Sequence, residues 1–261
     1  MSTRARTPPG GGALAAYVLH QYDWSESSLI VELFTRERGR LAVAAKGAKR
    51  PTSQLRPILL PFGRLVVQLA KAPADAELHT LRGADWAGGE PTVAGAALFA
   101  GFHLNELLLK LLPRQDPHPR LFDAYAATLR MLGAGDESAR RAALRAFEWL
   151  LLRELGWLPA LDAVTPTGRP VEAALGYTLH GEHGLVVAAG GIDGATLAAV
   201  HAALEADDLV GLRDACLAPA TAHRDALAAV LHYHLGQASL RTRQVMHGVH
   251  QLQRARAQPR G

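Results

Sequence analysis

The first third of the chain alternates apolar and polar residues with the period of two that half-buried β-strands show. Residues 17–19, 29–33, 41–45, 65–69 and 77–81 follow this pattern, and the polar run at 36–39 supplies a turn. Four to five strands with short connections over ~75 residues predict a small antiparallel sheet or barrel. A barrel of the OB type fits this pattern, as do other small barrels.

Beyond residues 88–91 the period changes to that of a helix. Leu104, Leu107, Leu108 and Leu111 have the spacing i, i+3, i+4, i+7 of a buried helical stripe. Further helices are predicted at 121–132, 144–155, 194–206, 220–235 and 240–252, and a helix start at the acidic pair 207–208. Residues 162–191 are rich in loop-forming residues, with short strands expected at 177–179 and 185–188.

These patterns predict an α+β protein in which an OB-type β-barrel precedes a mostly α-helical domain. We expect a disordered lead at 1–12, the barrel at 13–88, the helical domain at 89–252 and a basic tail at 253–261. The helical domain contains a small loop and strand insert at about 160–192.

Composition narrows the protein class. Of the 261 residues, 49% are hydrophobic, which excludes wholesale disorder. Cys216 is the single cysteine, so an intramolecular disulfide and a multi-cysteine metal centre are both excluded. The most apolar run, residues 96–112, contains four polar side chains, and the first residues lack a secretory pattern. We therefore expect a cytoplasmic protein with no membrane span.

Positive charge is concentrated on the predicted barrel. Residues 36–64 carry eight basic residues against one acidic residue, whereas residues 65–240 have a net charge of −7 and residues 241–261 one of +5. A one-signed patch on a small barrel suits a nucleic-acid backbone, because cations that neutralise phosphates release condensed counterions. The alternative is a solvated surface loop. The candidate phosphate contacts are Lys46, Lys49 and Arg50, extended by Arg36, Arg38, Arg40, Arg56 and Arg64.

Two further features bear on nucleic-acid binding. Gly47, inside the basic segment, lets backbone amides approach an anion closely. Most aromatic residues of the barrel region fall at core positions, but Tyr22 and Trp24 lie at an expected strand end, where their rings can stack on bases.

Patterns for catalysis or metal binding are weak. The twelve histidines include pairs at 180/183, 232/234 and 247/250, none in a His-Glu-x-x-His arrangement and none with a third ligand at a recognised spacing. No nucleophile elbow and no phosphate-binding loop occurs. Cys216 is expected to be a buried, inert thiol. We expect no enzymatic activity, no metal and no cofactor.

Two ordered motifs resemble the bacterial recombination mediator RecO family. The first runs from Glu26 through the Leu-Phe-Thr at 33–35 and Gly39 to the Ala-Lys-Gly-Ala-Lys-Arg-Pro-Thr-Ser of residues 45–53, followed by Pro-Phe at 61–62. The second is His-Leu-Gly at 234–236 followed by Leu-Arg-Thr-Arg at 240–243. The similarity spans roughly residues 13–252. One departure concerns the four-cysteine zinc site of many members: Val164 and Thr167 stand where a Cys-x-x-Cys pair is expected, and the second pair is absent near 184–189. We expect apolar packing, by Leu179, Leu185 and Val187, to hold the insert instead.

The resemblance implies a non-enzymatic function and an association with the nucleoid. The family binds single- and double-stranded DNA, anneals complementary strands, and works with RecR to help RecA displace single-strand binding protein (SSB). It also binds the acidic, hydrophobic C-terminal tail of SSB on its helical domain, which requires an apolar groove with cationic rims. Residues that can supply such a groove are Arg114, Arg120, Leu121, Phe122 and Arg130, with Leu129 beside them. A protein–protein adaptor with little direct DNA affinity is the alternative, and a histidine–metal hydrolase is the remote one.

Overall fold

The computed structural model describes residues 12–73, 76–88, 93–95, 97–218, 220–236, 240 and 242. Its contacts divide the chain into two compact units, the first made of Met1–Thr92 and Leu112–Asp123, the second of Val93–Leu111 and Ala124–Gly261. The lead at 1–11, the tail at 253–261 and most of the helix expected at 240–252 lie outside the described residues.

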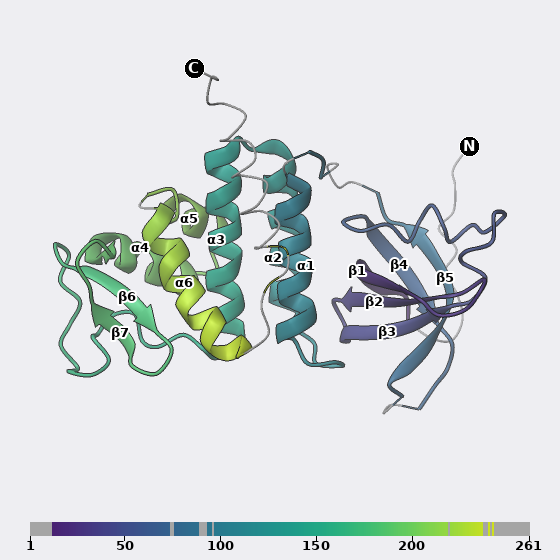
Figure 1. Cartoon of the computed structure of the whole chain (residues 1–261), viewed down its shortest axis with the longest axis horizontal. Helices are drawn as coiled ribbons and strands as arrows, with labels where there is room; N and C mark the ends of the chain where they lie inside the picture. The colour runs from purple at the N-terminus through teal and green to yellow at the C-terminus, as the bar shows by residue number, and fades with distance from the viewer. Residues whose placement is uncertain are drawn as a thin grey trace, which may run out of the picture. The chain divides into compact units, whose positions relative to one another are not determined.

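The first unit is built on a closed five-stranded barrel (Figure 1). Its strands are β1 (Leu14–Asp23), β2 (Leu29–Thr35), β3 (Gly39–Ala45), β4 (Arg64–Leu69) and β5 (Leu78–Trp86), in the order β1-β2-β3-β5-β4. All pairings are antiparallel except β3 with β5, and β1 with β4 closes the barrel. The barrel that was predicted from the alternation of apolar and polar residues is therefore confirmed.

The barrel core follows the period of two in each strand. Val31, Leu33, Leu65 and Val67 point inward and are fully buried. On the opposite face, Tyr17 and Phe34 are also buried, because the ring of Phe122 packs on both at centroid distances of 5.3 and 5.4 Å. An apolar stretch outside the strands thus covers one outer face of the barrel.

The segment Leu112–Asp123 belongs with the barrel by its contacts, although the sequence analysis placed it in the helical domain. The Gln115 amide donates to the carbonyl of Arg40 at 2.9 Å, and the Gln115 side chain donates to the carbonyl of Ala76 at 2.9 Å. Arg114 pairs with the buried carboxylate of Glu32 on β2. The barrel residues that bond to this segment lie far away in the sequence. A domain boundary drawn only from the period of the apolar residues therefore assigns the segment to the neighbouring helices.

The second unit is helical, as expected. It contains α1 (Ala97–Leu111), most of α2 (Pro119–Ala134), α3 (Glu137–Glu154), α4 (Gly194–Glu205), α5 (Leu209–Ala215) and α6 (Ala220–Leu235) (Figure 1). The stripe predicted in α1 is buried, and α3 packs against α1, α5 and α6 around the buried Trp149. Asp208 caps α5 by accepting from the amides of Val210 and Gly211 at 3.1 and 2.9 Å, which confirms the helix start predicted there.

The second of the two motifs described above, at residues 234–243, contacts α1 through Thr242. Leu240 is buried, and the hydroxyl of Thr242 lies 2.6 Å from Glu106 and 3.1 Å from His103 of α1. The Thr242 amide donates to the same Glu106 carboxylate at 2.9 Å. This threonine therefore fixes the end of the described chain to the first helix.

The insert forms a three-stranded sheet of β6 (Gly176–His180), β7 (Gly184–Val187) and β8 (Ile192–Asp193). Leu179 and Leu185 are buried as expected, but the expectation for Val187 is wrong, because its side chain is 55% exposed. Hydrogen bonds from Thr165 add to the packing: its amide donates to the Leu185 carbonyl at 2.9 Å, and its hydroxyl accepts from the Leu185 amide at 2.8 Å. This bonding ties the 162–170 loop, which carries Val164 and Thr167, to β7.

Candidate nucleic-acid interface

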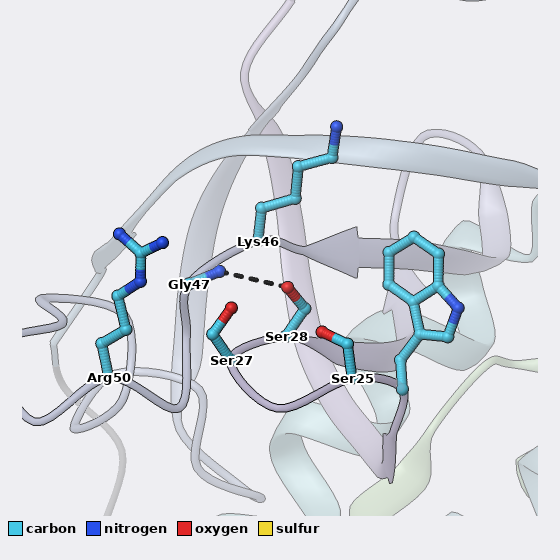
Figure 2. A pocket seen from close by; sticks show the side chains of 7 residues that line it. Ser25, Ser27, Ser28, Lys46, Gly47 and Arg50 are labelled. Carbon is cyan, nitrogen blue, oxygen red and sulfur yellow. Dashed lines mark hydrogen bonds between the residues drawn. The ribbon is translucent and has the colours of Figure 1, made fainter.

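Two loops of the barrel lie side by side because β2 and β3 are paired from Leu29↔Ala45 onward. One loop joins β1 to β2 at residues 24–28, and the other is the basic turn that follows β3. Gly47 adopts φ +70°, a conformation that favours glycine, and its amide donates to the hydroxyl of Ser28 at 3.3 Å (Figure 2). The turn residue singled out from the sequence therefore joins the two loops.

Between these loops is an open pocket of about 370 Å³. Figure 2 shows Lys46 and Arg50 on either side of Gly47, with the hydroxyl groups of Ser25, Ser27 and Ser28 turned toward one another. The Arg50 side chain lies over Gly47, with its Cδ and Nε 3.7 Å from the position a Cβ would take there. The pocket thus has cationic walls and a hydroxyl floor, and Trp24 completes its lining.

Lys49 contacts its own protein. Its Nζ lies 3.0 Å from Asp23 Oδ1 and donates to the carbonyl of Ser25 at 3.0 Å. Its backbone amide donates to the carbonyl of Ser27, also at 3.0 Å. Lys49 therefore holds the basic turn against the β1–β2 loop, and its charge is already opposed by an acid.

Three other cations of the expected track also have internal partners. Arg36 forms a two-point pair with Asp123, with N–O distances of 2.9 and 3.0 Å, and that hydrogen bonding together with the carboxylate charge raises the pKa of Arg36. Arg38 donates to His79 at 3.3 Å. Burial lowers the pKa of His79, with the Arg38 charge as a second cause, so the imidazole stays neutral and can accept this bond.

Arg40 is largely buried, with its side chain 16% exposed. It lies 3.4 Å from Glu32 and donates to the carbonyl of Leu112 at 3.1 Å. Burial lowers its pKa against the opposing effect of the Glu32 charge. Arg40 and Arg114 thus share one buried carboxylate, which ties the segment Leu112–Asp123 to the strands.

The other four cations have no ion pair with any described residue: Lys46, Arg50, Arg56 and Arg64. The first three are exposed and Arg64 is half-buried. The structure therefore separates the eight predicted residues into four with internal partners and four whose charges face solvent wholly or in part.

Exposed aromatic rings accompany these cations. Tyr22 is 47% exposed and Trp24 51% exposed, in keeping with the positions proposed from the sequence. Trp86, 67% exposed at the end of β5, escaped the sequence analysis. Like Trp24, Trp86 lies at the end of a strand, and this position could have indicated an exposed ring from the sequence.

A groove for the SSB tail needs exposed apolar side chains, and the two apolar residues expected to form it are buried. Leu121 and Phe122 are fully buried, and Phe122 packs on the barrel, so in this structure neither lines an open surface. Arg114 pairs with Glu32. Arg120 and Arg130 are exposed on α2, Arg120 in the first unit and Arg130 in the second. The burial of the two apolar residues is a correction to the expected groove.

Within the described part of the chain, no three His, Cys, Asp or Glu side chains gather in an arrangement that could hold a metal ion. The rings of His180 and His183 stack on each other at 4.6 Å. Cys216 is buried as expected, and burial raises its pKa to about 12. His247 and His250 lie outside the described residues. Among the helices that are described, none combines the length and apolarity needed to cross a membrane.

Comparison with known proteins gives a consistent result over nearly the whole chain. Residues 13–89 match the family described as Recombination protein O N terminal, and residues 94–244 match Recombination protein O C terminal. The chain is 49% identical over 243 residues to the DNA repair protein RecO of Variovorax paradoxus (strain S110), covering 88% of this chain and 93% of that protein. The DNA repair protein RecO of Polaromonas sp. (strain JS666 / ATCC BAA-500) is 47% identical over 236 residues, covering 88% and 94%.

Proposed function

The chain belongs to the recombination protein O (RecO) family of DNA repair and recombination proteins, and from this premise we propose how it acts. We propose that it is a mediator that binds single- and double-stranded DNA and anneals complementary strands. With RecR it helps RecA to replace SSB on single-stranded DNA. Its own side chains perform this without catalysis and without a cofactor.

The observation that carries the proposal is the pair of loops on the barrel. Lys46 and Arg50 present unopposed charge on either side of an open pocket, while Lys49 braces the turn that carries them. Each phosphate that such a cation neutralises releases counterions, which favours binding whatever the base sequence. Arg56 and Arg64 supply further positive charge on the same barrel unit.

Annealing follows from the same electrostatics. Two complementary strands repel each other through their phosphates, and base pairing begins only where that repulsion is reduced. A protein surface that neutralises several phosphates lowers the repulsion locally and raises the concentration of both strands at one place. No bond in the DNA is made or broken, so annealing requires no acid, base or metal.

Binding of the SSB tail is the part of the proposal that rests on the family alone. The tail is acidic and hydrophobic, so its site needs cations beside exposed apolar surface. Arg120 and Arg130 are exposed cationic candidates on α2, but the apolar surface must come from residues other than Leu121 and Phe122. RecR and RecA are proposed partners with no assigned surface.

One observation supports the alternative function, a protein–protein adaptor with little direct affinity for DNA. Arg36, Arg40 and Lys49 all pair with acidic residues of the same unit, which reduces the charge available to DNA. A protein that binds SSB through the helical unit and touches DNA weakly also fits such pairing. SSB-tail binding without measurable affinity for bare DNA favours the adaptor.

The test compares strand annealing by the wild-type protein and by a Lys46→Glu, Arg50→Glu double variant. We expect the rate of annealing of complementary oligonucleotides to fall at least tenfold at low salt. A matched control is Arg141→Glu, Arg224→Glu, which makes the same charge change at exposed helix positions paired with nearby acids. Equal loss in both double variants, or in neither, contradicts the assignment of this surface.

A further inference from the structure

The pocket between the β1–β2 loop and the basic turn has the size and lining of a site for a single nucleotide. Its volume of about 370 Å³ falls in the range of about 300–1,000 Å³ in which proteins hold small ligands. A phosphate track needs only a charged surface, whereas this feature is hollowed and has an aromatic residue in its wall. We propose that the pocket binds one unstacked nucleotide of a single strand, with its phosphate between Lys46 and Arg50 and its base on Trp24.

The phosphate half of the site is supplied by the basic turn. Lys46 and Arg50 flank Gly47, and Arg50 is held over the glycine backbone (Figure 2). The Ser28 hydroxyl accepts from the Gly47 amide at 3.3 Å and so keeps its own proton to donate to an anion. Two cations and a set of hydroxyl donors match the charge and the several acceptor oxygens of one phosphate diester.

The base half is supplied by Trp24. Its ring is 51% exposed and lines the same pocket, and its position is fixed by backbone bonds. The amides of Trp24 and Ser25 both donate to the carbonyl of Ser28 at 3.3 Å, which closes the loop into a tight turn. Stacking on an indole ring is open to every base because every base has a π-face, so this contact carries no sequence preference.

The brace formed by Lys49 makes the two halves one site. Lys49 ties the basic turn to Asp23 and to the carbonyl groups of Ser25 and Ser27. The two loops that carry the cations and the tryptophan are therefore joined before any ligand arrives, which lowers the cost of ordering their backbones on binding.

This site distinguishes single strands from duplexes. In a duplex each base is already paired and stacked, so placing one on Trp24 costs unstacking and unpairing energy. A phosphate track alone binds both forms. The pocket thus adds a preference for unpaired DNA to the proposed DNA-binding function, on which this inference rests.

The test uses three probes: a dT20 oligonucleotide, an abasic 20-mer with the same number of phosphates, and a 20-base-pair duplex. We expect the wild-type protein to bind dT20 about tenfold more tightly than the abasic strand, within the range that base–aromatic stacking provides. Trp24→Ala removes this difference and leaves affinity for the abasic strand and the duplex within twofold of wild type. Trp86→Ala is the matched control, because it removes an exposed tryptophan of the same barrel that does not line the pocket, and it keeps the difference.

The outcomes separate the two proposals. Salt-dependent binding that is equal for dT20 and the abasic strand, or a base-dependent difference lost in Trp86→Ala but not in Trp24→Ala, overturns the nucleotide pocket and leaves DNA binding intact. No measurable binding to any of the three probes overturns the DNA-binding function itself.

Discussion

The Nζ of Lys49 lies 3.0 Å from the carboxylate of Asp23, the last residue of β1. The same ammonium group donates to the Ser25 carbonyl at 3.0 Å, so its charge is paired and one of its protons is bonded within the protein. Of the three cations in the basic turn, Lys49 is therefore the one that positions the other two. Binding experiments can therefore distinguish a lost phosphate contact, in variants of Lys46 or Arg50, from a changed conformation of the basic turn, in variants of Lys49.

Lys49→Ala is predicted to weaken binding of single-stranded DNA about threefold while leaving its salt dependence unchanged. The loss comes from a looser turn, whereas each phosphate contact contributes about −0.7 to the slope of log K against log salt on a single strand. Fluorescence titration across a salt series measures both quantities. A slope that falls by about 0.7 in Lys49→Ala, as we expect for Lys46→Ala, shows instead that Lys49 contacts phosphate.

Glu32→Gln is predicted to destabilise the barrel unit by about 3 kcal/mol. The carboxylate is buried between Arg40 and Arg114, and removing its charge leaves a largely buried guanidinium uncompensated. Urea unfolding followed by tryptophan fluorescence measures the change. As a comparison, Asp123→Asn breaks the exposed pair with Arg36 and is expected to cost less than about 1 kcal/mol. Equal effects of the two substitutions contradict the role given to Glu32.

Glu32 and Asp123 illustrate which features of the structure can be predicted from the sequence alone. Alternation in the strands, including Leu65 and Val67 of β4, predicts the barrel because core burial follows directly from the period of two. The partner of Arg36 is 87 positions away, and no local pattern indicates it. Charge counting therefore found the basic surface but could not show which of its cations are already paired.

The same limit applies to apolar residues. Phe122 lies in a helical stripe beside arginines, a pattern that fits either a peptide groove or a core, and only its contact with Tyr17 and Phe34 decides for the core. Val187 lies two residues after Leu185 and on the same face of β7, but it is the last residue of a four-residue strand and is 55% exposed there. Trp24 is the favourable case, because an aromatic residue in a short polar turn has little core to enter.

The helical unit is predicted to lose stability as the pH falls from about 6.5 toward 4. Burial lowers the pKa of His223 to about 4, and the neutral ring accepts from the Trp149 indole at 3.2 Å and donates to the Ala215 carbonyl. The folded-state pKa lies below the unfolded value, so this contribution is fully present above pH 6.5 and is lost as the pH falls, by up to about 3 kcal/mol. Urea unfolding at pH 7, 6 and 5 measures it. In His223→Gln this part of the pH dependence should disappear, and its persistence contradicts the assignment to His223.

Thr165→Val is predicted to destabilise the insert by about 1–2 kcal/mol, because the buried Leu185 amide loses its hydroxyl acceptor. Limited proteolysis at the β6–β7 hairpin and hydrogen exchange at β7 report this loss locally. Thr167→Val is the control, since that hydroxyl accepts only a long 3.4 Å bond in an exposed loop. If Thr165→Val leaves exchange at β7 unchanged, packing of Leu179 and Leu185 alone holds the insert.

If Lys46 and Arg50 neutralise DNA phosphates, the salt dependence of single-strand binding reports it most directly. For Lys46→Ala, Arg50→Ala we predict a slope of log K against log salt smaller in magnitude by about 1.4 than that of the wild type, from two lost phosphate contacts. The Arg141→Ala, Arg224→Ala control should keep the wild-type slope. A double variant at the basic turn that binds with the wild-type slope and affinity contradicts the account.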